Sequence, residues 1–265
     1  MTVLTTTPVP LTTPEVPERR LHPFARQFVL ELRKLTDTRA GLGLLLGVIL
    51  LSALSLAGTI ATALPAERTS ATLLRALLAP QWVILPILGI VLVTGEFGKR
   101  TNASAFLLEP RRLRVLGAKV LAMLLVADVL HGVAVGLAAL GPVVLPRLTG
   151  HQWVAAMPDS VFTQGLAVQF TEVLVGVAFG ALIQSTAAAI AAFFTLPMIG
   201  FGAASAAGHG VVSWIDLSTT QTPLAGGTAT STDLLHFACA ALLWAVLPLA
   251  LGALRLRRRD LPVGG

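Results

Sequence analysis

Long apolar stretches separated by short polar segments run through the chain from residue 40 to residue 255. A helix that crosses a membrane needs about 20 mainly apolar residues, because the hydrocarbon core is about 30 Å thick and each helical residue rises about 1.5 Å. The pattern therefore predicts six membrane-spanning helices. Their expected bounds are 40–64, 78–95, 116–141, 163–183, 186–206 and 234–254.

The fourth and fifth of these helices come from one stretch, 173–206, that contains no charged side chain. As a single helix it would be about 51 Å long, which is far more than a bilayer needs. Gln184-Ser185-Thr186 interrupts the stretch near its middle. We interpret these three residues as a tight hairpin between two spans.

The composition supports a membrane protein. Hydrophobic residues make up 55% of the chain and charged residues only 12%, whereas a soluble domain is about one quarter charged. Too few polar side chains remain to cover a globule of this size. We therefore expect an all-α integral membrane protein in which residues 40–255 form one six-helix domain.

The basic side chains predict the topology. Most of the 19 Lys and Arg residues lie before the first span, between the second and third spans, or after the sixth span, and the 207–232 loop has none. By the positive-inside rule, both termini are cytoplasmic in a cell membrane. The net charge of +6 would favour a nucleic-acid partner in a soluble chain. Here anionic membrane lipid explains it better, so no nucleic acid is expected.

The two ends of the chain are predicted to be cytoplasmic tails. Residues 1–20 are rich in Thr and Pro and have no apolar core, which is typical of a disordered segment rather than a signal peptide. Residues 256–265 form a short basic tail.

Residues 21–39 are too charged to cross a membrane, but a helix over them is amphipathic. Arg26 and Arg33 lie opposite an apolar arc. The arc consists of Leu21, Phe24, Phe28, Leu32 and Leu35. This pattern predicts a helix in the cytoplasmic interface. The alternative is a plain cytosolic helix.

The loop between the second and third spans predicts a short cytoplasmic helix. Thr101 can cap a helix over 102–108 that exposes Phe106 and Leu107, and Pro110 can start the next helix. An apolar tip with a basic rim is suited to a partner's groove. The alternative is that the basic residues only set topology and bind lipid.

Ionisable side chains inside the predicted spans are candidates for a transport pathway, because such groups are costly in a bilayer. Asp128 and His131 lie three residues apart in the third span, which predicts one shared helical face. Glu172 lies in the fourth span and Gln184 at the hairpin. The alternative is a structural role, as an Asp128–His131 pair or a hydrogen bond to a neighbouring helix.

Pairs of glycines four residues apart predict helix faces that pack closely. They occur in the first, third and fourth spans. These pairs are Gly43 and Gly47, Gly132 and Gly136, and Gly176 and Gly180. No arrangement of side chains indicates catalysis, so the chain is not expected to be an enzyme.

Residues 22–259 resemble the ABC-2 type transporter permeases, the membrane-spanning subunits of one class of ABC exporter. The resemblance is most specific between the second and third spans, where the family pattern is Gly-Glu-aromatic, then Thr, Pro-Arg-Arg and Lys. The matching residues are Gly95, Glu96, Phe97, Thr101, Pro110, Arg111, Arg112 and Lys119. Arg100 stands where the family usually has glycine. The 211–226 stretch is similar in position to the family's re-entrant segment.

The resemblance implies a permease subunit that exports a hydrophobic or amphiphilic substrate. It would form a homodimer, or a heterodimer with a second permease, and associate with two copies of a cytosolic ABC ATPase subunit. ATP and Mg would bind to that subunit, so no cofactor is expected in this chain. The coupling helix and the residues around it would contact the ATPase. The coupling residues are Glu96, Thr101, Phe106, Leu107, Pro110, Arg111 and Arg112.

Two other functions remain open from the sequence. The chain could be a secondary transporter in which Asp128, His131 or Glu172 relays protons, or a membrane scaffold that transports nothing.

Overall fold

The computed structural model describes residues 23–98 and 112–258 of the chain. In these residues the regular structure is helical, and no strand is formed beyond an isolated bridge between Thr69 and Val154. Six helices are long and apolar enough to cross a membrane. The prediction of an all-α, multi-pass architecture is confirmed at this level.

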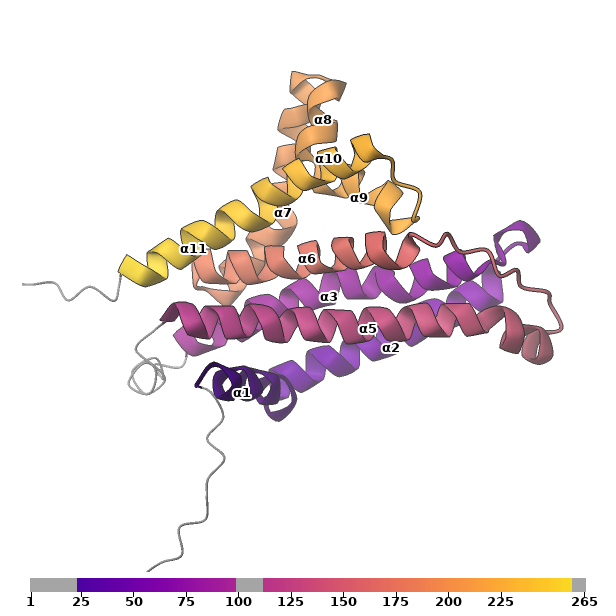
Figure 1. Ribbon diagram of the computed structural model, residues 1–265, viewed down its shortest axis with the longest axis horizontal. Helices are drawn as coiled ribbons and strands as arrows, with labels where there is room; N and C mark the ends of the chain where they lie inside the picture. The colour runs from indigo at the N-terminus through magenta and orange to yellow at the C-terminus, as the bar shows by residue number, and fades with distance from the viewer. Residues whose placement is uncertain (1–22, 99–111, 259–265) are drawn as a thin grey trace, which may run out of the picture.

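Figure 1 shows the arrangement of the elements. The helices are α1 (Pro23–Asp37), α2 (Arg39–Thr62), α3 (Ser70–Gly98), α5 (Arg112–Thr149), α6 (Val161–Ile183), α7 (Thr186–Ala207), α8 (His209–Ile215), α9 (Leu217–Ala225), α10 (Ser231–Ala241) and α11 (Leu247–Arg258), with η1 (Pro65–Glu67) before α3 and η2 (Leu242–Val246) joining α10 to α11. We call the end where α1 lies beside the start of α5 the α1 end, and the end with the α2–α3 and α5–α6 connections the far end.

The second and third spans are each longer than the sequence predicts by about two turns at the far end. α3 begins at Ser70 instead of residue 78, and α5 continues to Thr149 instead of residue 141. The extra turns contain Arg75 and Arg147, which are exposed. Hydropathy excluded these turns because of their charge, although a charged residue near the end of a span does not stop a helix.

The break between the fourth and fifth spans lies where the sequence predicts a hairpin. α6 ends at Ile183, and Gln184 adopts a left-handed conformation with φ of 61°. Ser185 is extended, and α7 begins at Thr186. A left-handed residue after a helix is a common way to end it.

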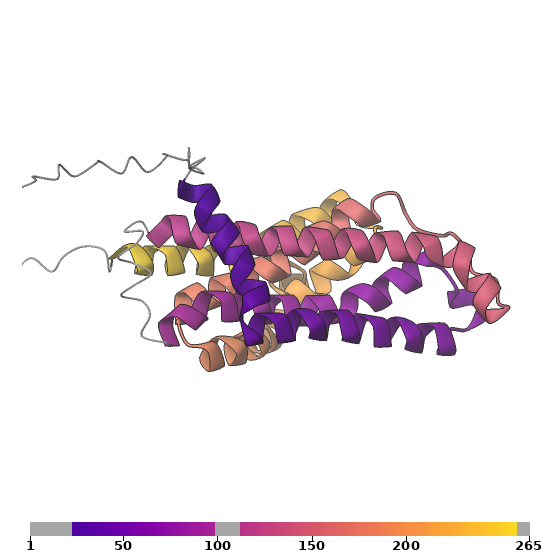
Figure 2. The same cartoon turned by 90° about the horizontal axis from the view of Figure 1, so that it is seen from below.

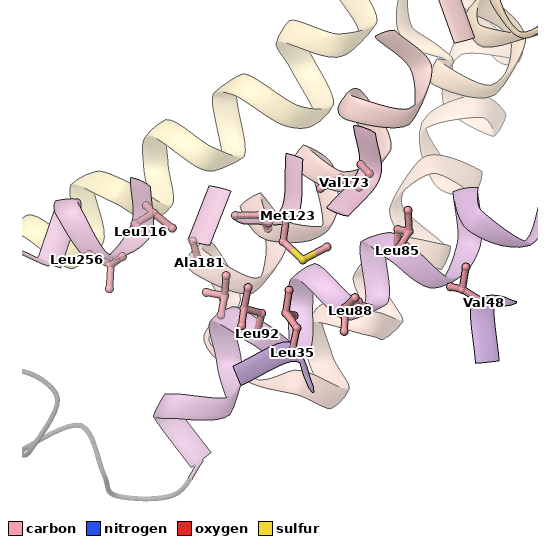
Figure 3. Close-up of a cluster of buried hydrophobic side chains, with 13 residues drawn as sticks. Leu35, Val48, Leu85, Leu88, Leu92, Leu116, Met123, Val173, Ala181 and Leu256 are labelled. Atoms are coloured by element: carbon pink, nitrogen blue, oxygen red, sulfur yellow. The ribbon is translucent and has the colours of Figure 1, made fainter. Parts of the chain in front are cut away.

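α3 and α6 lie at the centre of the bundle, and six helices contribute to the main core cluster. Leu35 of α1, Val48 of α2 and Met123 of α5 meet side chains of α3 and α6 there, and Leu256 of α11 completes the cluster (Figure 3). At the α1 end, α1 runs across the start of α5 rather than along it (Figure 2).

Only one of the three glycine pairs packs closely within the chain. A Cβ on Gly176 would overlap the Pro86 carbonyl oxygen, and one on Gly180 would meet Val93 and Ile90. By contrast, no described atom lies within 4 Å of a Cβ built on the other four glycines. These are Gly43, Gly47, Gly132 and Gly136. The predicted close packing of the first and third spans is therefore wrong within this chain.

Residues 207–232, between the fifth and sixth predicted spans, contain two short helices, α8 and α9. α7 and α8 rise away from α2, α3, α5 and α6, and α9 returns to pack on α6 (Figure 1). The Trp244 indole donates a hydrogen bond to the Ile215 carbonyl oxygen at the α8–α9 junction, at 2.7 Å. Trp244 lies in the π-helical turn η2, just before Pro248, whose missing N–H disturbs the regular ladder of the helix.

Candidate functional site

A buried ion pair ties α1 to the bundle. The Glu31 carboxylate is completely buried, and it accepts hydrogen bonds from Lys119 at 2.7 Å, Lys34 at 2.7 Å and Gln27 at 2.8 Å. Lys119 Nζ also donates to the Leu92 carbonyl oxygen of α3 at 3.0 Å. We call these five residues the α1-end cluster.

The α1-end cluster joins three helices at one point. Glu31 belongs to α1, Leu92 to α3 and Lys119 to α5. Removing one partner of a buried ion pair leaves a charge without compensation, which is costly at low dielectric. The position of α1 is therefore fixed relative to the end of α3 and the start of α5, the two helices on either side of residues 99–111.

Four of the five residues predicted to form the apolar face of α1 are buried or partly buried, and Leu21 lies outside the described residues. Leu35 is 2% exposed and belongs to the main core, and Phe24, Phe28 and Leu32 are partly buried. Glu31 was missed as a site residue. Its signal was in the sequence, because on a helical wheel it lies at the edge of the apolar arc, about 60° from Phe28.

Most of the predicted ATPase-coupling residues lie outside the described residues. Glu96 falls in the last turn of α3, and Arg112 is the first residue of α5. The others are Thr101, Phe106, Leu107, Pro110 and Arg111.

Asp128 and His131 lie close enough on α5 for the Asp128 charge to act on the histidine, but the two side chains differ in burial. His131 is completely buried, and neither ring nitrogen has a hydrogen-bond partner among the described residues. Its ring packs edge-on against Phe162 with the ring centroids 5.5 Å apart. It also packs against Gly165, where a Cβ would lie 3.0 Å from His131 Cε1. Asp128 is exposed and forms no hydrogen bond or ion pair with a described residue. Residues three apart differ by about 60° around a helix, and here the boundary of the buried face falls between them.

Glu172, the middle residue of α6, is held by α9. Its Oε1 accepts a hydrogen bond from Gln221 Nε2 at 2.7 Å. One turn away on α6, Gln169 Nε2 donates to Gln81 Oε1 of α3 at 3.1 Å, and both of these amides are buried. We call Gln81, Gln169, Glu172 and Gln221 the mid-span polar cluster.

The sequence analysis did not identify the three glutamines of this cluster as site residues. A lone amide in an apolar stretch is a weak signal, and the partners are far apart along the chain. Gln184, which was predicted as a pathway residue, is not part of the cluster. It lies twelve residues after Glu172, about 18 Å along the helix.

Neither cluster has the donor set of a metal site. Within residues 23–98 and 112–258, no group of three His, Cys, Asp or Glu side chains could hold a metal ion. Comparison of the chain with protein-family models, with curated proteins and with solved structures finds no match.

Proposed function

We propose that the chain is the membrane permease subunit of an ATP-binding cassette exporter. It moves a hydrophobic or amphiphilic substrate across the cytoplasmic membrane, with energy from a separate ATPase subunit. The observation that carries this proposal is the α1-end cluster. A permease driven from outside the membrane needs a rigid part that receives force, and the Glu31–Lys119 ion pair makes α1 rigid relative to α3 and α5.

In this proposal the segment between α3 and α5 is the contact with the ATPase. Residues 99–111 connect two helices that are both linked to α1 through Lys119. A push on the segment would reach α1 and the core of the bundle together, because Leu35 of α1 packs in that core. Two copies of the ATPase would act on two permeases.

The second permease, identical or related, supplies the partner for surfaces that this chain leaves uncovered. α2 and α7 are each only 11% buried over their most apolar part. Large apolar side chains such as Leu50, Met198 and Ile199 are exposed on them. Lipid and a second permease would share these surfaces.

Co-purification tests the coupling. The full chain, co-expressed with the ATPase encoded beside it, is expected to retain that ATPase through detergent extraction. Phe106→Asp is expected to abolish retention, because it places a charge in an apolar contact. Val154→Asp is the matched control, since Val154 is exposed at the far end of the molecule. Retention by Phe106→Asp, or loss with both variants, contradicts the proposal.

A proton-coupled secondary transporter is the second candidate, and the buried His131 with two unpartnered ring nitrogens favours it. Histidine changes charge near neutral pH, so a relay through it would make transport pH-dependent. Transport by His131→Gln and Asp128→Asn should then lose its dependence on pH between about pH 6 and 8. Unchanged transport without ATP supports this candidate over the exporter.

A further inference from the structure

The hydrogen bonds of the mid-span polar cluster have only one allowed direction. Gln81 Nε2 donates to the Leu77 carbonyl oxygen at 3.2 Å, and a carbonyl oxygen can only accept. The Oε1 of Gln81 therefore faces Gln169 and accepts a hydrogen bond from Gln169 Nε2. Gln169 Oε1 is left over as an acceptor. This atom is buried, and it has no hydrogen-bond partner among the described residues.

A second free acceptor lies on the same face of α6. Glu172 is three residues after Gln169, so the two side chains are neighbours on the helix surface. Only Oε1 of Glu172 accepts from Gln221, and the other carboxylate oxygen makes no hydrogen bond with a described residue. The cluster thus contains two acceptors that receive no hydrogen bond from a described residue. They are Gln169 Oε1 and the second carboxylate oxygen of Glu172.

The charges along the described spans favour a cation as the missing donor. Every Lys and Arg in the six spans lies near a helix end, as Arg75, Lys119 and Arg255 illustrate. The ionisable groups at mid-length are Glu172, Asp128 and His131. An anion would be repelled by the Glu172 and Asp128 carboxylates, whereas a cation would be attracted.

The surroundings of the cluster favour an organic cation over a metal ion. A divalent metal ion takes about six oxygen ligands, and the described residues offer two free acceptors. An organic ammonium needs only a few acceptors and also brings an apolar body. Apolar side chains next to the cluster on α3 and α6 are only partly buried, among them Trp82, Ala167 and Leu174.

We propose that the mid-span polar cluster binds the ammonium group of a hydrophobic or amphiphilic organic cation, with the Glu172 carboxylate and Gln169 Oε1 as its acceptors. This assignment rests on the proposed export function, since it names the class of substrate that the permease carries. The apolar body of the cation packs against the partly buried apolar side chains of α3 and α6 beside the cluster.

Binding to the permease alone tests this assignment without the ATPase. The full chain is placed in nanodiscs of zwitterionic phosphatidylcholine and titrated with a fluorescent long-chain alkylammonium. The comparison probe is the same molecule acetylated on its amine, which removes the charge. Saturable binding of the ammonium is expected, with binding of the amide at least about tenfold weaker, because hydrogen bonds to charged groups contribute that much.

Two matched variants locate the site. Glu172→Gln keeps the shape of the side chain and removes the charge, so it should weaken ammonium binding by at least about tenfold. Glu67→Gln is the control, because Glu67 is an exposed carboxyl group outside the bundle whose bond to the Leu64 amide a glutamine can also make. Circular dichroism and thermal unfolding verify that both variants fold.

Several outcomes overturn the assignment. Equal binding of the ammonium and the amide to the unmodified chain does so even if Glu172→Gln fails to fold. Equal binding by Glu172→Gln, equal uptake by empty nanodiscs, or competitive displacement by sodium ions does so as well. If the chain binds ammonium and amide equally but still co-purifies with the ATPase, only the organic-cation assignment is overturned. Failed co-purification with intact ammonium binding overturns the exporter proposal instead.

Discussion

α3 and α6 have the same apolar character as α2 and α7, yet the two pairs have opposite surroundings. Over the most apolar part of each helix, 61% of α3 and of α6 is buried inside the molecule, against 11% of α2 and of α7. The inner pair carries buried polar side chains, among them Gln81 and Gln169. The outer pair exposes large apolar side chains such as Leu50 and Ile199.

The difference between the inner and outer helices indicates that the molecule is surrounded by lipid rather than water. In a soluble bundle the outer helices carry polar side chains toward water. Here the amides Gln81 and Gln169 turn inward and pair with each other, and apolar side chains such as Leu50 and Ile199 face out. This is the arrangement that a lipid solvent favours, because an unpaired polar group in hydrocarbon is costly. The predictions below test the difference between inner and outer positions.

The largest effect is expected at the buried charge that ties α1 to the inner helix α3. Glu31→Ala leaves Lys119 buried without its carboxylate and should lower the free energy of unfolding by about 3–5 kcal/mol. Asp37→Ala on the same helix removes an exposed carboxylate and should change it by less than about 0.5 kcal/mol. Thermal unfolding in detergent measures both. Equal effects of the two variants would show that the buried pair does not hold α1.

The next largest effect is expected at the closest contact between the inner helices. In Gly176→Ala, the new methyl group would meet the Pro86 carbonyl oxygen, which should cost about 2–3 kcal/mol of unfolding free energy. Gly43→Ala on α2 meets nothing described within 4 Å. It should be neutral or slightly stabilising, because alanine favours a helix over glycine. A larger loss of stability from Gly43→Ala would reverse the assignment of inner and outer faces.

A smaller effect is expected in the amide pair between α3 and α6. Gln81→Leu or Gln169→Leu alone leaves a buried amide without its partner and should cost about 1–3 kcal/mol. The double variant removes both polar groups and should recover most of that loss. A double-mutant cycle in chemical or thermal unfolding measures the coupling. Additive losses would mean that the two amides do not depend on each other.

The smallest effect is expected on the outer surface. Ile199→Ala on α7 removes an exposed apolar side chain, so the stability of the single chain should change by less than about 0.5 kcal/mol. An apolar photolabel in the membrane should mark α2 and α7 and leave α3 and α6 unmarked. Protection of α7 that Ile199→Ala abolishes would identify a second permease on this face instead of lipid.

Hydropathy was enough to predict the number of spans and the break at Gln184, because both depend on the local chain. It could not distinguish inner from outer helices, since both kinds are equally apolar. The glycine pairs illustrate this limit. Gly176 packs on α3 whereas Gly43 packs on nothing described, although the two motifs have the same spacing.

The polar sites were harder to predict because their partners are distant in sequence. Asp128 and His131 were grouped by spacing, but the edge of the buried face separates them. Gln81 and Gln169 were overlooked because an uncharged amide does not interrupt an apolar stretch. Glu31 was overlooked because its partner Lys119 is distant in the sequence and belongs to another helix.

The same ion pair also determines the order in which the protein can be assembled. Glu31 and Lys119 are 88 residues apart, and a chain is synthesised from its N-terminus. Glu31 therefore leaves the ribosome before the first span, and its partner appears only as the third span begins. Until then α1 lacks the ion pair that ties it to α5, although it can already contact α2. Docking of α1 thus marks the moment when the first part of the bundle has been inserted in the correct order.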